Sequence, residues 1–165
     1  AQRMLSSGED PLYLARRMIR FASEDIGNAD PQALTVALAA REAYSILGSP
    51  EGDLALLQCA IYLATAPKSN AVYVAEQRIR AEIERTGSLP VPPHLRNAPT
   101  ELMKSLGYGA GYQYDHDCDG GIAGQHYLPD GVTQKTFYEP RNTGFEKEIA
   151  RRMTWWEERR HQADR

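Results

Sequence analysis

The stretch GSPEGDLALLQCAIYLATAPKSNAVYVA, residues 48–75, is the main basis for the fold expected of this chain. Residues 54–66 are apolar at nearly every position, with Gln58 and Thr65 as the exceptions. A helix that is apolar all round is buried in a larger protein or spans a membrane, and this run would rise only about 20 Å, which is too short for a bilayer. The run therefore predicts a core helix, in which Leu57→Ala or Ile61→Ala would cost about 2–5 kcal/mol.

Local signals predict where this helix begins and ends. Ser49 can act as the N-cap, with Pro50 at the first helical position, where its missing N–H has no cost. Pro67 ends the helix, and Ser69 or Asn70 can cap the next one. Because the link between them is short, the two helices are expected to form an antiparallel hairpin.

Further helices are predicted on both sides of this hairpin from caps and apolar periodicity. Residues 1–9 look like the tail of a truncated upstream helix that ends at Gly8, which is expected of a piece of a longer protein. Asp10-Pro11 and Asp30-Pro31 begin two helices, which end near Gly27 and at Gly48. The expected apolar stripes are Leu12, Ala15, Ile19 and Ala22, joined by Met18; Val72, Ala75, Ile79 and Ile83; and Phe145, Ile149, Met153 and Trp156. Glu76, Arg78, Arg80, Glu82 and Glu84 are expected on the solvent side of the second hairpin helix, before its stop at Gly87.

The middle of the chain is expected to be irregular. Four prolines in residues 88–99 exclude a regular helix and predict an extended strap. Residues 100–106 form a short helix, and residues 108–127 predict a long loop rich in Gly, Tyr and Asp. Residues 125–128 and 135–138 are the candidates for a short two-stranded ribbon. The expected fold class is therefore all-α, a bundle of about five main helices with one long irregular segment.

Composition sets limits on the class of protein. A length of 165 residues suits one domain, 1–165, with a real core. The formal net charge of −3 argues against a mainly electrostatic nucleic-acid binder. Cys59, within the apolar run, and Cys118 make no disulfide framework, so a reducing cytosol is expected. We expect no membrane association, because the sequence has no signal peptide and no long apolar run.

Catalytic motifs are absent from the sequence. The Lys68-Ser69 pair lacks the glycines of a phosphate-binding loop. The four histidines, His94, His116, His126 and His161, have no spacing that demands a nucleophile. We therefore expect no enzyme active site and no bound cofactor in this chain.

One local pattern is typical of a metal site. Asp115, Asp117, Asp119 and Gly120 match the first half of a calcium loop. His126 stands where the closing carboxylate belongs, and the flanking residues are poor helix formers. An acidic solvated turn is the favoured interpretation, and a transition-metal site on His116, Cys118 and His126 is the weakest of the three.

Charged and aromatic side chains offer surfaces for partners. Ten arginines could touch phosphate but are interleaved with acids, which favours solvated helix faces. They are Arg16, Arg17, Arg20, Arg78, Arg80, Arg85, Arg151, Arg152, Arg159 and Arg160. Aromatic residues concentrate at protein interfaces, so Tyr62, Tyr73, Trp155 and Trp156 are the candidate contacts between subunits.

Several stretches together resemble the C-terminal region of the replication-associated recombination protein A family, also called MgsA, whose eukaryotic relatives are the Werner-helicase-interacting ATPases. They are DPLYLARRMIRFASEDIGNADPQAL (10–34), LGSPEGDLAL (47–56), APKSNAVYVA (66–75), LPVPPHLRNAPTELMKSLGYG (89–109) and HYLPD (126–130). Within them the candidate structural or interface residues are Lys68, Ser69, Asn70, His94, Arg96, Asn97 and Pro99.

The resemblance implies an all-α collar similar to the C-terminal oligomerisation domain of clamp-loader subunits. It further implies a homotetramer, contact with single-stranded-DNA-binding protein or other fork proteins, and a bacterial cytoplasmic, nucleoid-associated location. A DNA-dependent ATPase motor, with its ATP and Mg²⁺, would lie outside this chain. The alternative function is a nucleic-acid-binding module that targets the ATPase to DNA, and its binding would depend on salt. A metal-binding module is a weaker third.

Overall fold

A computed structural model describes residues 2–134 and 136–163, without the side chains of Asp119, Gln162 and Ala163. Its α-helices are α1 (Gln2–Ser6), α2 (Pro11–Phe21), α3 (Gln32–Leu47), α4 (Asp53–Thr65), α5 (Ala71–Thr86), α6 (Glu101–Ser105) and α7 (Glu146–Ala163). The described residues include no strand, so the all-α prediction is confirmed. The five longest helices, α2, α3, α4, α5 and α7, are the five expected main ones.

The chain divides into two compact units. The first contains the residues up to Glu76 and Tyr138–Ala150, and the second contains Gln77–Phe137 and the residues from Arg151 onward. The prediction of one domain over residues 1–165 stays a prediction.

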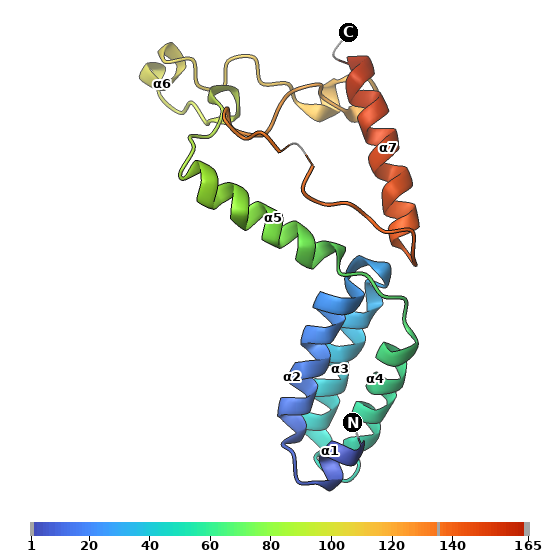
Figure 1. Ribbon diagram of the computed structural model, residues 1–165. Helices are drawn as coiled ribbons and strands as arrows, with labels where there is room; N and C mark the ends of the chain where they lie inside the picture. Colours follow the sequence, from blue (N-terminus) through green and yellow to red (C-terminus); the bar gives the residue numbers. More distant parts are fainter. Residues whose placement is uncertain (1, 135, 164–165) are drawn as a thin grey trace. The chain divides into compact units, whose positions relative to one another are not determined.

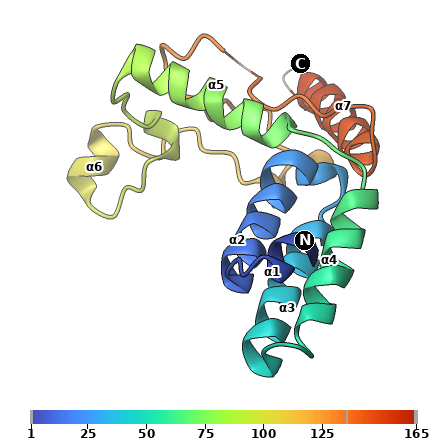
Figure 2. The ribbon, with the colours of Figure 1, turned by 60° about the horizontal axis from the view of Figure 1, so that its bottom comes forward.

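The first unit is built on a bundle of α2, α3 and α4, which lie side by side in all views (Figures 1 and 2). The side chain of Asp10 caps α2 by accepting from Leu12 N at 2.9 Å, with Pro11 at the first helical position as predicted. The core combines large residues of α2 with small ones of α3, which let the helices approach closely. It contains Leu14, Met18, Ala22, Ile26, Ala33, Ala37, Ala40, Cys59 and Leu63, with Met4 and Leu5 of α1 packed against it.

The expected start and partner of the central helix are wrong. Helix α4 begins at Asp53, and Ser49-Pro50 lies in the preceding turn, where Ser49 Oγ donates to Asp53 Oδ2 at 3.0 Å. Helix α4 forms its hairpin with α3, and it also packs against α2. Because the link before α5 is extended and Ser69 N donates to Asp25 O at 2.8 Å, the chain is directed to the segment after α2 rather than back along α4.

The expectation that α4 is buried on all sides is also wrong. Leu56, Cys59 and Leu63 are buried, whereas Leu54, Leu57 and Ile61 are 71%, 36% and 58% exposed. The reason is geometric: α2 and α3 both pack on one side of α4, and an outward face is left. The same holds for parts of the other predicted stripes, since Leu12, Val72, Ile79, Ile83, Phe145 and Trp156 are exposed.

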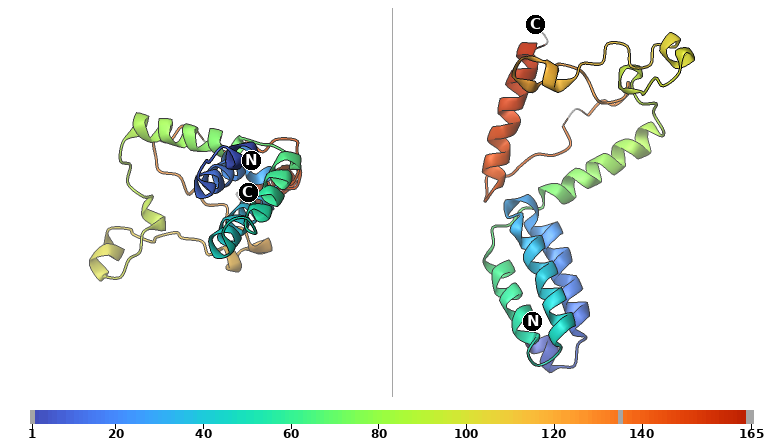
Figure 3. Two further views of the ribbon diagram at one scale, coloured as in Figure 1. Left: turned by 90° about the horizontal axis from the view of Figure 1, so that it is seen from below. Right: turned by 180° about the vertical axis from the view of Figure 1, so that it is seen from behind.

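The second unit contains the irregular segment, whose course between α5 and α7 can be followed in Figure 3. Helix α6 begins as predicted, with Thr100 Oγ1 accepting from Met103 N at 3.3 Å. The predicted ribbon is wrong for residues 125–128 and 136–138, which form no strand, and Lys135 lies outside the described residues. Two backbone carbonyl groups of these segments accept hydrogen bonds from side chains instead. His94 Nε2 donates to His126 O at 2.8 Å, and Arg78 donates to Phe137 O at 3.3 Å.

Candidate functional site

Glu146 lies in the first unit at the start of α7; it is 0% exposed, and its carboxylate accepts hydrogen bonds from three donors. Its Oε2 accepts from Ser69 Oγ at 2.7 Å and from Arg141 N at 2.6 Å, and its Oε1 accepts from the Tyr138 hydroxyl at 2.8 Å. Asn28 in turn donates to the Tyr138 oxygen at 3.2 Å. A buried carboxylate is stable only when it is hydrogen-bonded in this way. Because the hydrogen-bond partners come from three segments that are distant along the chain, the network joins these segments to one another.

Glycine is required beside this network. Gly144 has a φ of +48°, and a Cβ there would lie 2.0 Å from the Ala29 carbonyl oxygen. That oxygen accepts from Phe145 N at 2.8 Å. The close approach of the two backbones leaves no room for a side chain, and it brings Glu146 to Ser69.

The motif residues Lys68, Ser69 and Asn70 have structural contacts. Lys68 Nζ donates to the carbonyl groups of Leu63, at 2.8 Å, and Ala66, and so binds the negative end of α4. Ser69 caps α5 by accepting from Ala71 N at 3.2 Å, as predicted. Asn70 Oδ1 accepts from the Arg141 guanidinium at 2.7 Å.

Two tyrosines of the first unit have raised pKa values. Burial, with the neighbouring Glu146 carboxylate, raises the pKa of Tyr138 to about 12, although the bond from Asn28 acts in the opposite direction. The hydrogen bond to Asp30, at 2.7 Å, raises the pKa of Tyr62. Both hydroxyls therefore stay protonated at neutral pH and serve as donors rather than as bases.

The motif residues His94 and Arg96 hold the proline-rich strap in the second unit. Arg96 Nε donates to Val91 O at 2.6 Å, and its guanidinium lies 4.9 Å from the Tyr108 ring centroid and donates to the Tyr108 hydroxyl at 3.0 Å. His94 binds the carbonyl of His126. Asn97 and Pro99 are exposed. The strap is thus fixed to the loop that follows it.

The acidic loop has a structural role at one of its three aspartates. Asp115 Oδ1 accepts from Ala123 N at 2.8 Å, whereas Asp117 is exposed and the Asp119 side chain lies outside the described residues. Among the residues that the structure describes, no three His, Cys, Asp or Glu side chains gather as metal ligands. Cys118 donates to Tyr114 O at 3.4 Å. Cys59 is buried as expected, and its burial raises the pKa of its thiol.

Glu82 was expected on the solvent side of α5 but is nearly buried in the second unit. It binds Arg85 through both oxygens, at 2.6 and 2.9 Å, and it accepts from Thr133 N at 3.1 Å. Arg85 also donates to Gly131 O at 3.0 Å. The Arg85 hydrogen bonds, aided by the backbone N–H of Thr133, lower the pKa of Glu82 to about 2, against an opposing effect of desolvation.

We predict that Glu82 makes the stability of the chain depend on pH in the acid range. A lowered folded-state pKa contributes stability above the unfolded pKa near 4.5, and this contribution is lost as pH falls toward about 2. At neutral pH the unfolding midpoint of wild type should be higher than that of Glu82→Gln. The difference between the two midpoints should narrow as pH falls through this window. The exposed Glu84→Gln, on the same helix, is the control, and a gap for Glu82→Gln that is constant with pH would contradict the assignment.

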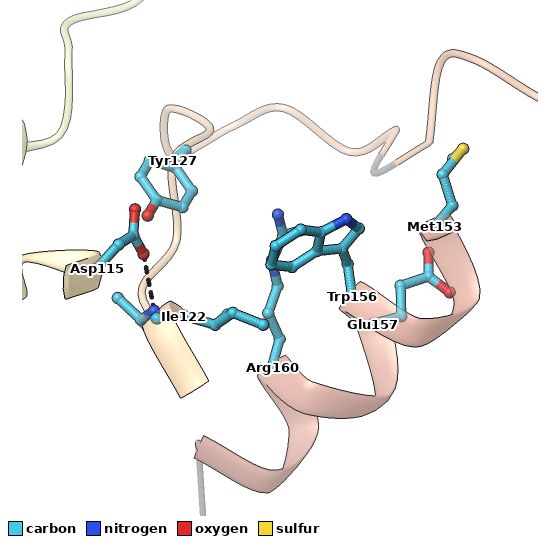
Figure 4. A pocket seen from close by; sticks show the side chains of 9 residues that line it. Asp115, Ile122, Tyr127, Met153, Trp156, Glu157 and Arg160 are labelled. Carbon is cyan, nitrogen blue, oxygen red and sulfur yellow. Dashed lines mark hydrogen bonds between the residues drawn. The ribbon is translucent and has the colours of Figure 1, made fainter. Parts of the chain in front are cut away.

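The candidate interface aromatics differ in their surroundings. Tyr62 is partly buried, while Tyr73, Trp155 and Trp156 are exposed. The two indoles meet edge to face with centroids 4.8 Å apart, and Arg159 lies 4.8 Å from the Trp155 ring. Trp156 lines a pocket of about 570 Å³ in the second unit, and Figure 4 shows its ring on the side toward Asp115 and Tyr127 of the loop.

Some of the candidate arginines contact side chains three or four residues away along the chain. Arg20 pairs with Glu24 at 2.6 Å, while the guanidinium groups of Arg16 and Arg17 lie 5.4 and 5.9 Å from the Tyr13 ring centroid. These α2 residues line a pocket of about 470 Å³ with Phe21 and Asp25. Arg160 lines the pocket beside Trp156.

Two buried glutamates that bind several neighbours, Glu146 and Glu82, were not predicted from the sequence. A glutamate in the first turn of a helix is common because it complements the helix dipole, so Glu146 carried no special signal. The signal for Glu82 was its i,i+3 spacing from Arg85, which equally describes an exposed pair.

Among the described residues, no helix is long and apolar enough to cross a membrane.

The comparisons with known proteins agree with the resemblance. The chain is 52% identical to Replication-associated recombination protein A of Coxiella burnetii over 93% of its length, which is 35% of that relative. It is 47% identical to the protein of the same name from Escherichia coli K12, over 93% of the chain and 34% of the relative. It is 51% identical to ATPase WRNIP1 of Dictyostelium discoideum, over 83% of the chain and 16% of the relative. The chain thus spans about a third of the length of these bacterial relatives. The family described as "MgsA AAA+ ATPase C terminal" matches residues 1–157, and the chain therefore belongs to this family.

Proposed function

We propose that this chain is the assembly and partner-interaction region of an AAA+ ATPase that acts in replication-fork maintenance and recombination. The family and the names of the relatives support the recombination role. The observation that carries the assembly role is the outward face of α4. Its exposed residues Leu54, Leu57 and Ile61 recur at helical spacing, and the exposed residues beside them, Gln58 and Thr65, carry no charge.

An uncharged apolar face of this kind suits self-association. Monomeric proteins seldom expose contiguous apolar patches larger than a few hundred Å². Each Å² of such a patch that is removed from water is worth about 25 cal/mol. A face without charges can also meet its own copy without repulsion, as a twofold contact requires. The proposed assembly is a homotetramer, in which Tyr62, Tyr73, Trp155 and Trp156 are further candidate contacts.

The proposal assigns no catalysis to this chain. ATP and Mg²⁺ would be bound in the part of the ATPase outside the chain, and the collar would hold the motors together. The proposed partners are single-stranded-DNA-binding protein or other fork proteins, with DNA reached through the full-length protein.

A nucleic-acid-binding module is the second candidate, favoured by the three arginines Arg16, Arg17 and Arg20 on α2. Phosphate contacts release counterions, so affinity for DNA would then fall steeply with salt. No binding to DNA at low salt would remove this candidate and leave the first.

Light scattering tests the assembly role. We expect a mass of about four times 18.4 kDa for the wild-type chain. The double variant Leu57→Glu, Ile61→Glu should be monomeric, since it places charges in the apolar contact. The control is Leu102→Glu, at a leucine on α6 that is also exposed. A wild-type mass near 18.4 kDa across a concentration series would reject the proposal.

A further inference from the structure

An open apolar groove runs between α2 and α4 in the first unit. It has a volume of about 300 Å³. Leu14, Arg17, Met18 and Phe21 form its α2 side at i, i+3, i+4 and i+7, and Ala60, Leu63 and Ala64 form its α4 side. The pocket of about 470 Å³ that contains Tyr13, Arg16 and Arg20 shares Arg17 and Phe21 with this groove. An apolar floor is therefore continuous with a basic rim.

We infer that this groove binds an acidic amphipathic helix of a partner protein. The inference rests on the proposed role of the chain in partner interaction and names the chemistry of one partner. The helix would place apolar side chains on Leu14, Met18 and Leu63 and acidic side chains beside Arg16, Arg17 and Arg20.

The walls of the groove favour a helix over an extended peptide. Both walls are α-helices, whose backbone N–H and C=O groups are already paired along their length. An extended segment gains affinity by pairing its backbone with a free sheet edge, whereas a helix satisfies its own backbone and buries one apolar face. Ala60 and Ala64 lie one turn apart and have small side chains, so a partner helix can come close to α4.

The rim selects an acidic partner. Arg16 and Arg17 are exposed, and the Arg20 side chain remains 78% exposed although it pairs with Glu24. Carboxylates at the edge of the helix would meet these guanidinium groups at the surface, where they add specificity and association rate.

The same features disfavour a nucleic acid in this groove. Stacking of a base needs an open aromatic face, but the Tyr13 ring has the guanidinium groups of Arg16 and Arg17 within 6 Å of its centroid. Glu24 and Asp25 interrupt the run of arginines in the same pocket, so the rim offers no continuous cationic surface to a phosphate backbone. The apolar floor offers no donor to phosphate or base edges.

The test uses the 165-residue chain and a fluorescent helical peptide with Leu at i, i+4 and i+7 and Glu at the flanking positions. Fluorescence anisotropy should show saturable binding, and the same peptide with Lys in place of Glu should not bind. Arg17→Glu and Ala64→Arg should each weaken binding by at least about tenfold, through like charge and through loss of space. Arg41→Glu, the same charge change on the exposed side of α3, should leave affinity within about twofold.

Three outcomes would overturn the inference. They are peptide binding that Arg17→Glu and Ala64→Arg leave unchanged, displacement of the peptide by an oligothymidylate, and a fall in the light-scattering mass for Arg17→Glu. The last would assign the groove to a second copy of this chain. If the groove does not bind the peptide but the mass of the Arg17→Glu chain stays at the wild-type value, the assembly proposal is unaffected.

Discussion

Glu146→Ala is expected to lower the free energy of unfolding by about 3–5 kcal/mol. The substitution removes the acceptor of three donors, the Ser69 hydroxyl, the Tyr138 hydroxyl and the Arg141 backbone N–H. The Ser69 hydroxyl in particular is held where water cannot replace the carboxylate, because Glu146 and Ser69 are buried. Urea denaturation followed by circular dichroism measures the effect.

Two further variants make this expectation precise. Glu146→Gln keeps one oxygen but turns an NH₂ toward a donor, so a smaller loss of about 1–3 kcal/mol is expected. Glu42→Ala, on the exposed side of α3, is the matched control and should stay within about 0.5 kcal/mol of wild type. Equal unfolding free energies for Glu146→Ala and Glu42→Ala would show that the network does not stabilise the fold.

Leu56→Ala is expected to cost about 2–5 kcal/mol, because this side chain is 0% exposed and its loss leaves a cavity. Ile61→Ala, on the outward face of the same helix, is expected to cost less than about 1 kcal/mol in the monomer. This replaces the sequence-based expectation of a large loss at Leu57 and Ile61. Denaturation at protein concentrations below assembly measures both variants.

Protein concentration separates packing within one chain from packing between chains. If the outward face of α4 is an interface, the cost of Ile61→Ala should grow as the chain assembles, while the cost of Leu56→Ala in the monomer stays fixed. A loss at Ile61 as large as that at Leu56 in the dilute monomer would contradict the observed exposure.

Local chemistry explains why much of the fold was predictable. The cap Asp10, the short helix that begins after Thr100 and the stop at Gly48 depend on neighbours a few residues away, so their signals lie within short stretches of sequence. The irregular course of residues 88–99 likewise follows from proline, which has no N–H to donate. Of the candidate site residues, Ser69 was predicted as a cap, but its bond to Glu146 was not.

The helical segments, the class of fold and the family could be predicted from the amino acids alone, because each depends on local propensity or on matched motifs. The buried face of α4 became known only from the folded chain, since an all-apolar run has no polar side to mark its exposed face. The folded chain also brings Ser69, which is distant along the sequence, within hydrogen-bonding distance of Glu146. Tyr138 and Arg141, which precede Glu146 by a few residues, bind the same carboxylate across a tight turn. Long-range contacts of this kind depend on the close approach of Gly144 to Ala29, and no local pattern encodes that approach.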